Sequence, residues 1–117
     1  MLANLHKFVT IYRRVDDESA LETFFSETHL MLLEQLPGLV KTEIGRISYK
    51  PGGDSRFHMM VEAYFDSSDD LKNAFLTPVG IELMQALKPW AEAGIITWFY
   101  CDSWEEESEI EPEDREN

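Results

Sequence analysis

One stretch, residues 56–66, limits the folds that this chain can adopt. Its composition is that of a strand whose two faces both carry apolar side chains. Every second side chain from Phe57 to Phe65 is apolar, while the positions between them mix apolar and polar side chains. A Pro-Gly-Gly-Asp turn precedes the stretch and a Ser-Ser-Asp-Asp helix start follows it. Such a strand is typical of the centre of a sheet that is covered on both sides.

The rest of the chain divides into helical and extended segments around this strand. Apolar residues at helical spacing predict a long first helix, which Pro37-Gly38 ends. Thr77-Pro78 predicts the start of a later helix, with threonine as the cap and proline in the first helical position. The predicted elements are strand 5–13, helix 17–36, strand 39–49, strand 56–66, helix 68–76, helix 77–92 and strand 95–102.

This order of elements predicts an α+β, ferredoxin-like βαββαβ domain, with a four-stranded antiparallel sheet and the helices on one face. Because crossovers are right-handed, the expected strand order is fourth, first, third, second. The 117 residues suit one domain, which we place at residues 1–102. Residues 103–117 hold eight acidic residues and one arginine, and we expect this acidic C-terminal tail to be largely disordered.

The charge distribution argues against two classes of partner. Of the net charge of −13, the tail carries −7 and residues 1–102 carry −6. The body lacks the clustered cations that bind nucleic acid, and an anionic membrane surface would repel it. Cys101 is the only cysteine, so no intrachain disulfide forms. With an N-terminus that lacks a signal-peptide pattern, these features lead us to expect a cytoplasmic protein.

One face of the predicted sheet has no helix to cover it. That face would expose an aromatic and apolar surface too large for a comfortable monomer. Face-to-face pairing of two sheets in a homodimer would bury it. The predicted helix-facing residues are Val9, Ile11, Met59, Val61 and Phe65, and the predicted dimer face consists of Phe8, Tyr12, His58, Met60, Glu62 and Tyr64.

The predicted register adds two polar contacts on this dimer face. Pairing of Phe8 with Glu62 places Tyr12 beside His58, where a Tyr-His hydrogen bond is either functional or only satisfies two polar groups. Glu62 suits an interchain ion pair, with Arg46 as the candidate partner, better than the role of a catalytic acid.

Short motifs are spread over nearly the whole chain outside the tail, and each is weak alone. The order and spacing in which they follow one another make the set specific. They are Val9-Thr10-Ile11-Tyr12, Phe24-Phe25, Thr28-His29, Leu36-Pro37-Gly38-Leu39, the strand Phe57 to Tyr64, and Phe65-Asp66-Ser67.

In this order the motifs resemble the EthD-like family of dimeric α/β-barrel, ferredoxin-like proteins. The family motif Thr-His-x-Pro-Leu is here Thr28-His29-Leu30-Met31-Leu32, so Met31 stands in place of the proline and changes the helix near His29. The resemblance implies a homodimer and a small apolar pocket between helices and sheet, but little chemistry. The name-giving member is linked to degradation of a fuel ether. Related barrels include cofactor-independent monooxygenases, haem-degrading enzymes, dye peroxidases and polyketide cyclases.

We therefore expect a dimeric small-molecule protein of undefined reaction. It is a cofactor-independent enzyme or an accessory protein in the degradation or modification of a small apolar or aromatic compound. An enzyme of this kind would be a monooxygenase-like oxidoreductase or cyclase-like. The alternative is a non-catalytic dimeric ligand-binding or scaffold module, since a shared fold does not imply a shared reaction.

His29 is the first candidate for a functional residue. It lies on the flank of the buried helical stripe, where the rim of a pocket is expected, and can act as a general base or hydrogen-bond a ligand. The alternative is a structural histidine that fixes the helix. The predicted catalytic residue is His29, and the predicted ligand pocket consists of Phe25, His29, Leu32, Val61 and Trp90.

No metal site is predicted. His58 and Glu62 lie about 13 Å apart along an extended strand, at about 3.3 Å per residue, which is too far for one ion. Haem ligation by His29 or His58 is an alternative that no feature of the sequence supports. We therefore predict no cofactor. Cys101 is more readily a packed small residue than a nucleophile.

Overall fold

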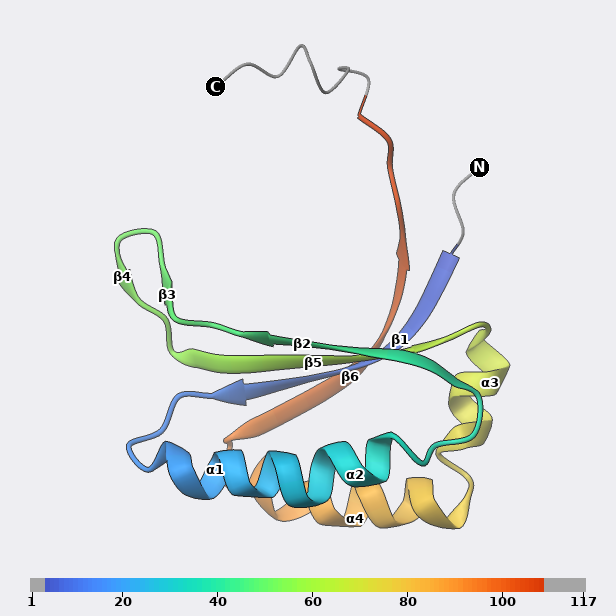
Figure 1. The fold of residues 1–117 in the computed structure, drawn as a ribbon, viewed down its shortest axis with the longest axis horizontal. Coiled ribbons are helices and arrows are strands. Elements are labelled where there is room, and N and C mark those ends of the chain that lie inside the picture. The colour runs from blue at the N-terminus through green and yellow to red at the C-terminus, as the bar shows by residue number, and fades with distance from the viewer. Residues whose placement is uncertain (1–3, 109–117) are drawn as a thin grey trace.

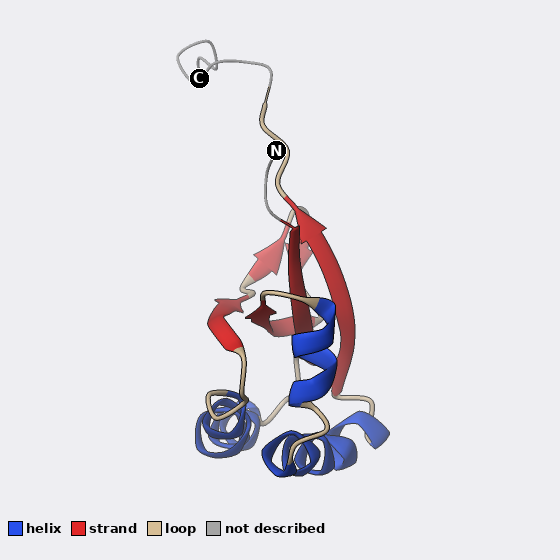
Figure 2. Cartoon of the chain, turned by 90° about the vertical axis from the view of Figure 1, so that its right-hand side faces the viewer, coloured by secondary structure: helices blue, strands red, loops and turns tan. Residues whose placement is uncertain are grey.

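The computed structural model describes residues 4–108 and consists of a curved sheet with a helical layer against one face (Figure 1). The turned view separates the two layers, with α3 standing beside the sheet (Figure 2). The elements are β1 (Asn4–Arg13), α1 (Glu18–Phe24), η1 (Phe25–His29), α2 (Leu30–Leu33), β2 (Leu39–Arg46), β3 (Tyr49–Lys50), β4 (Gly53–Asp54), β5 (Phe57–Phe65), α3 (Ser68–Ala74), α4 (Pro78–Glu92) and β6 (Ile96–Trp104).

The main sheet has four strands in the order β2-β5-β1-β6, and its neighbours are antiparallel. This is the predicted order, with β1 and β5 in the two central positions, so the ferredoxin-like α+β fold is confirmed. The short strands β3 and β4 form a separate hairpin, which projects to the side opposite the helices (Figure 1).

The first helix contains an irregular turn that the sequence analysis did not predict. Residues 25–29 form a π-helical turn, in which the N–H of Leu30 donates to the carbonyl of Phe25. A π turn inserts one extra residue into an α-helix, and such insertions are frequent at functional sites. His29 is the last residue of this turn, so the local geometry sets where its side chain enters the core.

The helix at α4 begins as predicted. The Thr77 hydroxyl accepts a hydrogen bond from the N–H of Gly80, and Pro78 occupies the first helical position. Gly80 lies where α4 meets the end of α3, and a Cβ there would come within 2.3 Å of the carbonyl oxygen of Ala74. Only glycine allows this close approach of two backbones.

The prediction of which β1 side chains face the helices is wrong. Phe8 pairs with Ala63 and not with Glu62, and a shift of one residue turns every side chain of a strand over. Phe8 and Tyr12 therefore belong to the buried core, with 2% and 0% of their surfaces exposed. Val9 and Ile11, predicted to face the helices, lie on the opposite side. On β5, Met59, Val61 and Phe65 belong to the core as predicted.

His58 also differs from its predicted place. The pairing of β1 with β5 shifts between Tyr12 and Arg13, so that no residue of β1 pairs with His58. This irregularity turns the imidazole toward α1, where its Nε2 lies 2.6 Å from Oε2 of Glu22. The expected contact between Tyr12 and His58 on an open face is therefore replaced by two separate contacts on the helical side.

The last strand is longer than predicted. β6 continues to Trp104, so the proposed domain boundary at residue 102 falls inside a strand. Residues 105–108 have no regular structure, and the rest of the predicted acidic tail lies outside the described residues. Within residues 4–108, no helix is long and apolar enough to cross a membrane.

Candidate functional site

Tyr12 and His29 form a buried pair between the sheet and the first helix. β1 supplies Tyr12 from its helical face, and the π turn supplies His29; both side chains are 0% exposed. The Tyr12 hydroxyl and Nδ1 of His29 share a hydrogen bond. The two ring planes are parallel to within 5°, with centroids 5.7 Å apart. The pair thus connects the central strand to the irregular turn.

The environment keeps both members of the pair uncharged. Burial lowers the pKa of His29 from 6.5 to about 4, which makes the imidazole neutral at neutral pH. Burial, with a smaller effect of the Glu22 carboxylate, raises the pKa of Tyr12 far above its usual value. A neutral imidazole has one N–H and one acceptor nitrogen, so the tautomer decides which partner donates.

The two tautomers give His29 opposite chemical properties. If the Tyr12 hydroxyl donates to Nδ1, then Nε2 carries a proton and can donate to a ligand. If Nδ1 donates to the Tyr12 oxygen, then Nε2 has a free lone pair and can accept a proton. In both cases the bond to Tyr12 orients the ring, as a hydrogen bond to one nitrogen commonly does.

Two buried polar atoms of this region have no hydrogen-bond partner among residues 4–108. They are Nε2 of His29 and Oγ1 of Thr10. Thr10 is 0% exposed and lies two residues before Tyr12 on the same face of β1, which places their Cα atoms about 7 Å apart. Buried polar groups are nearly always hydrogen-bonded, so each of these two unpaired atoms needs an explanation.

Aromatic rings surround His29. Phe25 meets the imidazole edge-on, at a centroid distance of 5.8 Å and an angle of 89°. The ring centroid of Phe24 lies 6.4 Å from that of the imidazole and 5.1 Å from that of Trp90 on α4. Phe24 and Trp90 are half-buried, so this pair covers His29 on the side where the two helices meet.

The structure brings most of the predicted pocket residues into one region. Phe25 contacts His29 directly, and Trp90 reaches it through Phe24. Val61 pairs with Thr10 in the ladder between β1 and β5. Leu32 packs at the edge of the core without a described contact to His29. Tyr12, Thr10 and Phe24 were not among the predicted pocket residues, although all three stand in the motifs that carry the family resemblance. Tyr12 was instead assigned to the dimer face.

A second polar cluster lies along α1, between this helix and the sheet. Glu22 accepts hydrogen bonds from Arg46, at 2.6 Å, and bonds Nε2 of His58, also at 2.6 Å. Nδ1 of His58 lies 3.3 Å from a Glu18 oxygen but has no hydrogen-bonding geometry there. The hydrogen bond from Arg46, more than that from His58, lowers the pKa of Glu22. This cluster fastens α1 to β2 and β5.

Metal binding has no support in residues 4–108. No group of three His, Cys, Asp or Glu side chains in that part of the chain is arranged to hold an ion. Both nitrogens of His58 face carboxylates, and those of His29 face Tyr12 and the core.

The face opposite the helices is more polar than predicted. Met60, Glu62 and Tyr64 lie there by register, but Glu62 accepts a hydrogen bond from Lys7 at 2.8 Å and not from Arg46. Arg46 is engaged with Glu22. The hydroxyl of Tyr64 donates to Glu43, and two lysines lie over its ring.

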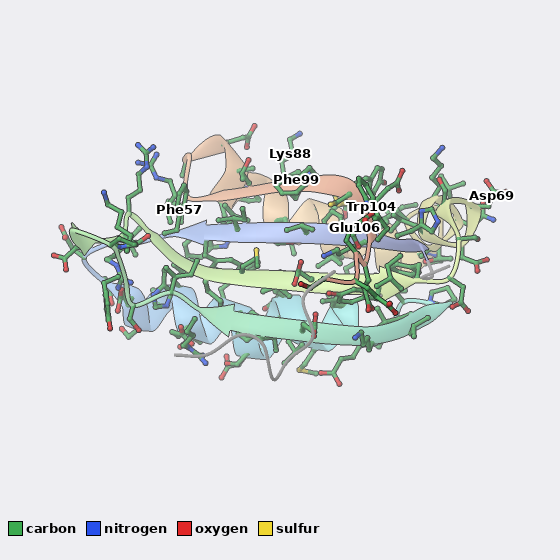
Figure 3. All side chains as sticks on the ribbon, turned by 90° about the horizontal axis from the view of Figure 1, so that it is seen from above. Phe57, Asp69, Lys88, Phe99, Trp104 and Glu106 are labelled. Atoms are coloured by element: carbon green, nitrogen blue, oxygen red, sulfur yellow. The ribbon has the colours of Figure 1, made fainter. Side chains whose placement is uncertain are left out.

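An apolar strip remains in the middle of that face. Val9 pairs with Phe99 across β1 and β6, and Ile11 pairs with Met60 across β1 and β5. Phe99 is 43% exposed and stands on the open side of β6 (Figure 3).

Solved structures with this architecture are numerous and define the class of fold as a ferredoxin-like α+β domain. A crystal structure of an ethyl tert-butyl ether D (EthD) family protein from Bacillus halodurans has a TM-score of 0.77 and 27% identity. The match covers 83% of this chain and 96% of that one. The resemblance to the EthD-like family is therefore confirmed by this structural neighbour.

Two further structures show the range of proteins that share the fold. A dimeric ferredoxin-like protein of unknown function from Bacteroides fragilis is 19% identical, with a TM-score of 0.56 over 86% of this chain and 95% of that one. SnoaB from Streptomyces nogalater, a cofactor-independent oxygenase, is 16% identical, with a TM-score of 0.61 over 93% of this chain and all of that one.

Sequence comparison gives one relative and no family assignment of its own. An uncharacterized 11.0 kDa protein from Rhodococcus erythropolis is 21% identical over 95 residues, which cover 81% of this chain and 92% of that protein. No protein-family profile matches the chain.

Proposed function

We propose that this chain is a homodimeric EthD-like protein that takes up a small apolar or aromatic compound at the Tyr12–His29 pair. It acts on that compound as a cofactor-independent enzyme or as an accessory protein in its degradation or modification. One observation carries the proposal. A neutral, fully buried histidine stands on a π turn, with one ring nitrogen bonded to Tyr12 and the other without a partner.

The residues suggest a simple division of roles. Tyr12 orients the imidazole, and the aromatic rings of Phe24 and Phe25 exclude water from it. Nε2 of His29 then meets the polar group of the bound compound, as an acceptor that takes a proton or as a donor that polarises an oxygen. A base with a pKa near 4 is weak in the free protein, so proton removal requires a ligand whose acidity rises on binding.

Independence from a cofactor has support from a structural neighbour. SnoaB is a cofactor-independent oxygenase with the same fold, so this fold can carry oxygen chemistry without a bound cofactor. At 16% identity, that likeness extends to the fold alone. The type of reaction is therefore left open between oxygenation and other modifications.

The homodimer has support from the open face of the sheet. By register, the apolar strip of Val9, Ile11, Met60 and Phe99 lies on the open face of β1, β5 and β6. The β3–β4 hairpin and the end of β6 both project to that side (Figure 1). Val9 is already buried, with 3% of its surface exposed, whereas Phe99 is 43% exposed. A second copy related by a two-fold axis would bury the exposed part of this strip. The protein from Bacteroides fragilis that shares the fold is dimeric, which supports the proposal of a dimer.

A non-catalytic ligand-binding module is the second candidate. It is favoured by the complete burial of His29 and by the ring pair of Phe24 and Trp90 that covers it. A site of this kind holds a compound without offering it to a second reactant.

Mass spectrometry of compounds retained by the purified protein tests the proposal. The protein is isolated without organic solvent and extracted, alongside a His29→Gln variant of confirmed fold. We expect a small apolar or aromatic compound with the wild-type chain and little of it with the variant. Conversion of that compound in air with a chelator present would indicate an enzyme, and its return unchanged would indicate a binding module. An empty wild-type protein with a purely destabilised variant would contradict the proposal.

A further inference from the structure

We propose that the acidic segment at the end of β6, from Trp104 to Glu107, binds the basic β3–β4 hairpin of a second copy of this chain, and does so twice in a two-fold dimer. This inference rests on the proposed homodimer and adds to it the contact that orients the two copies.

The hairpin end of the sheet carries cations without an acidic partner in the described part of the chain. Lys50 and Arg56 line a surface hollow of about 380 Å³ beside Phe57. Arg13 of β1 pairs with Phe57, which brings a third cation to this end. All three cationic residues are exposed, and none forms an ion pair within residues 4–108. Asp54 also lines the hollow, but the three cations outnumber it.

Arg14 holds the base of the hairpin in place. Its guanidinium donates to the carbonyl oxygens of Ile47 and Ser55, which flank the hairpin, and to Glu18 on α1. Its backbone N–H donates to the carbonyl of Arg56 at 2.7 Å. Because these bonds fix the hollow before a partner arrives, binding there requires little further ordering.

The other end of the open face carries the opposite charge. Glu105, Glu106 and Glu107 are exposed and form no ion pair with any described residue. They follow Trp104, which ends β6, is 62% exposed and donates its indole N–H to Glu106 at 2.6 Å. Figure 3 shows Phe57 at one end of this face and Trp104 with Glu106 at the other. An exposed indole followed by acids suits a hollow lined by an aromatic ring and cations.

These acids cannot reach the hairpin of their own copy. On β1, Asn4 pairs with Trp104 and Arg13, nine positions further on, pairs with Phe57. At about 3.3 Å per residue, the two points lie roughly 30 Å apart along the strand. Glu107 is three residues beyond Trp104, which is a reach of about 10 Å. Opposite charges that are too far apart within one chain are available to a second chain.

Charge also selects the direction of the two-fold axis. The hairpin and the end of β6 project to the same open side from opposite ends of the sheet (Figure 1). When two sheets pair face to face, an axis parallel to the strands places hairpin over hairpin and acid over acid, and like charges repel. An axis inclined to the strands exchanges the two ends, so that each hairpin meets the acidic segment of the other copy.

Charge-reversed variants of the full chain test this contact. The hairpin variant combines Lys50→Glu with Arg56→Glu. The segment variant combines Glu105→Lys, Glu106→Lys and Glu107→Lys. Each variant alone brings like charges together in the dimer, whereas a heterodimer of the two variants pairs opposite charges at both contacts.

The matched control for the hairpin variant is the combination of Lys72→Glu and Lys88→Glu. These lysines lie on α3 and α4, are exposed and likewise have no ion pair among the described residues, and the change in net charge is the same. Sedimentation equilibrium gives the dissociation constant of each dimer, and native mass spectrometry separates homodimers from heterodimers.

We expect each charge-reversed variant alone to dimerise about tenfold more weakly than wild type at low salt, and the control to match wild type. An equimolar mixture of the hairpin and segment variants should form mainly heterodimers, with an affinity near that of wild type. Addition of about 0.5 M NaCl should narrow these differences, because salt screens exposed charges.

Two results would overturn this inference and leave the proposed homodimer standing. One is a hairpin variant that dimerises as well as the control, and the other is a mixture without preference for heterodimers. Wild-type protein that is monomeric at micromolar concentration overturns both the inference and the homodimer.

Discussion

The hydroxyl of Tyr12 and Nδ1 of His29 share a hydrogen bond across the boundary between β1 and the first helix. This bond exists because the register of β1 turns Tyr12 toward the helices and because the π turn brings His29 onto the sheet. One strand residue and one helix residue, 17 positions apart, therefore fix the centre of the candidate site. The two ring nitrogens of His29 consequently have different environments, one bonded and one not.

His29 should make stability depend on pH between about 4 and 6.5. Its pKa is lowered to about 4 in the folded protein, while the unfolded chain keeps a pKa near 6.5. Between these values the unfolded chain binds a proton that the folded protein does not. The free energy of unfolding therefore falls as the pH falls, by about 3 kcal/mol over the whole range, and is unaffected by His29 above it.

Urea unfolding of wild type and His29→Gln at several pH values measures this dependence. The difference between the two curves isolates His29 from the other titrating groups. We expect the wild-type curve to fall more steeply below pH 6.5. Parallel curves would show that His29 titrates normally and is not buried as described.

Thr10→Val should stabilise the ligand-free protein. The substitution replaces a buried hydroxyl without a partner by a methyl group of nearly the same shape. Removing such a group recovers part of its desolvation cost, about 1 kcal/mol, or about 4 °C in melting temperature. Differential scanning calorimetry checks the value. A lower melting temperature would mean that the hydroxyl has a partner in the protein.

Glu22→Gln should loosen the attachment of α1 to β2 and β5. The carboxylate accepts a hydrogen bond from Arg46 and contacts His58, both at 2.6 Å, and the amide keeps the shape without the charge. Charge-assisted bonds of this kind typically contribute about 1–2 kcal/mol when partly buried. Glu27→Gln, at an exposed position of the π turn, is the control and should leave the free energy of unfolding unchanged. Equal effects in chemical unfolding would remove the special role of Glu22.

Phe99→Asp should shift the protein from dimer to monomer. Phe99 is 43% exposed in the apolar strip of the open face, and a charge there would have to be buried between two copies. Ile81→Asp changes a residue of similar exposure, 47%, on the helical layer and should not affect assembly. Sedimentation velocity at micromolar concentration distinguishes the two states. A wild-type monomer under these conditions would rule out the proposed dimer.

The sequence was sufficient for the fold because its signals were local and agreed with one another. Thr77-Pro78 marked a helix start, Pro37-Gly38 marked a helix end, and right-handed crossovers left one strand order. These features concern a few neighbouring residues each. The EthD-like resemblance came from the same short motifs.

The sequence did not indicate which face of β1 points toward the helices. Val9 and Ile11 on one side are as apolar as Phe8 and Tyr12 on the other, so alternation gives no preference. The decision lies in the pairing of Phe8 with Ala63, which is a contact between distant segments.

The geometry of the candidate site depends on two backbone irregularities that sequence patterns do not predict. The π turn at residues 25–29 moved His29 from the flank of the helix into the core. The shift in pairing beside His58 turned that residue to Glu22 and left Tyr12 for His29. His29 and Phe25 were found from the sequence because they follow the apolar stripe, whereas Thr10 has no such signal.

A crystal structure of the protein with 1-naphthol is the most direct test of the account. We predict the naphthol oxygen within hydrogen-bonding distance of Nε2 of His29, with the ring against Phe24 and Phe25. The contradicting result is an unchanged Tyr12–His29 pair with naphthol elsewhere. The apolar groove between α4 and β6, lined by Phe75, Ile81, Met84, Gln85, Lys88 and Trp98, is one such place.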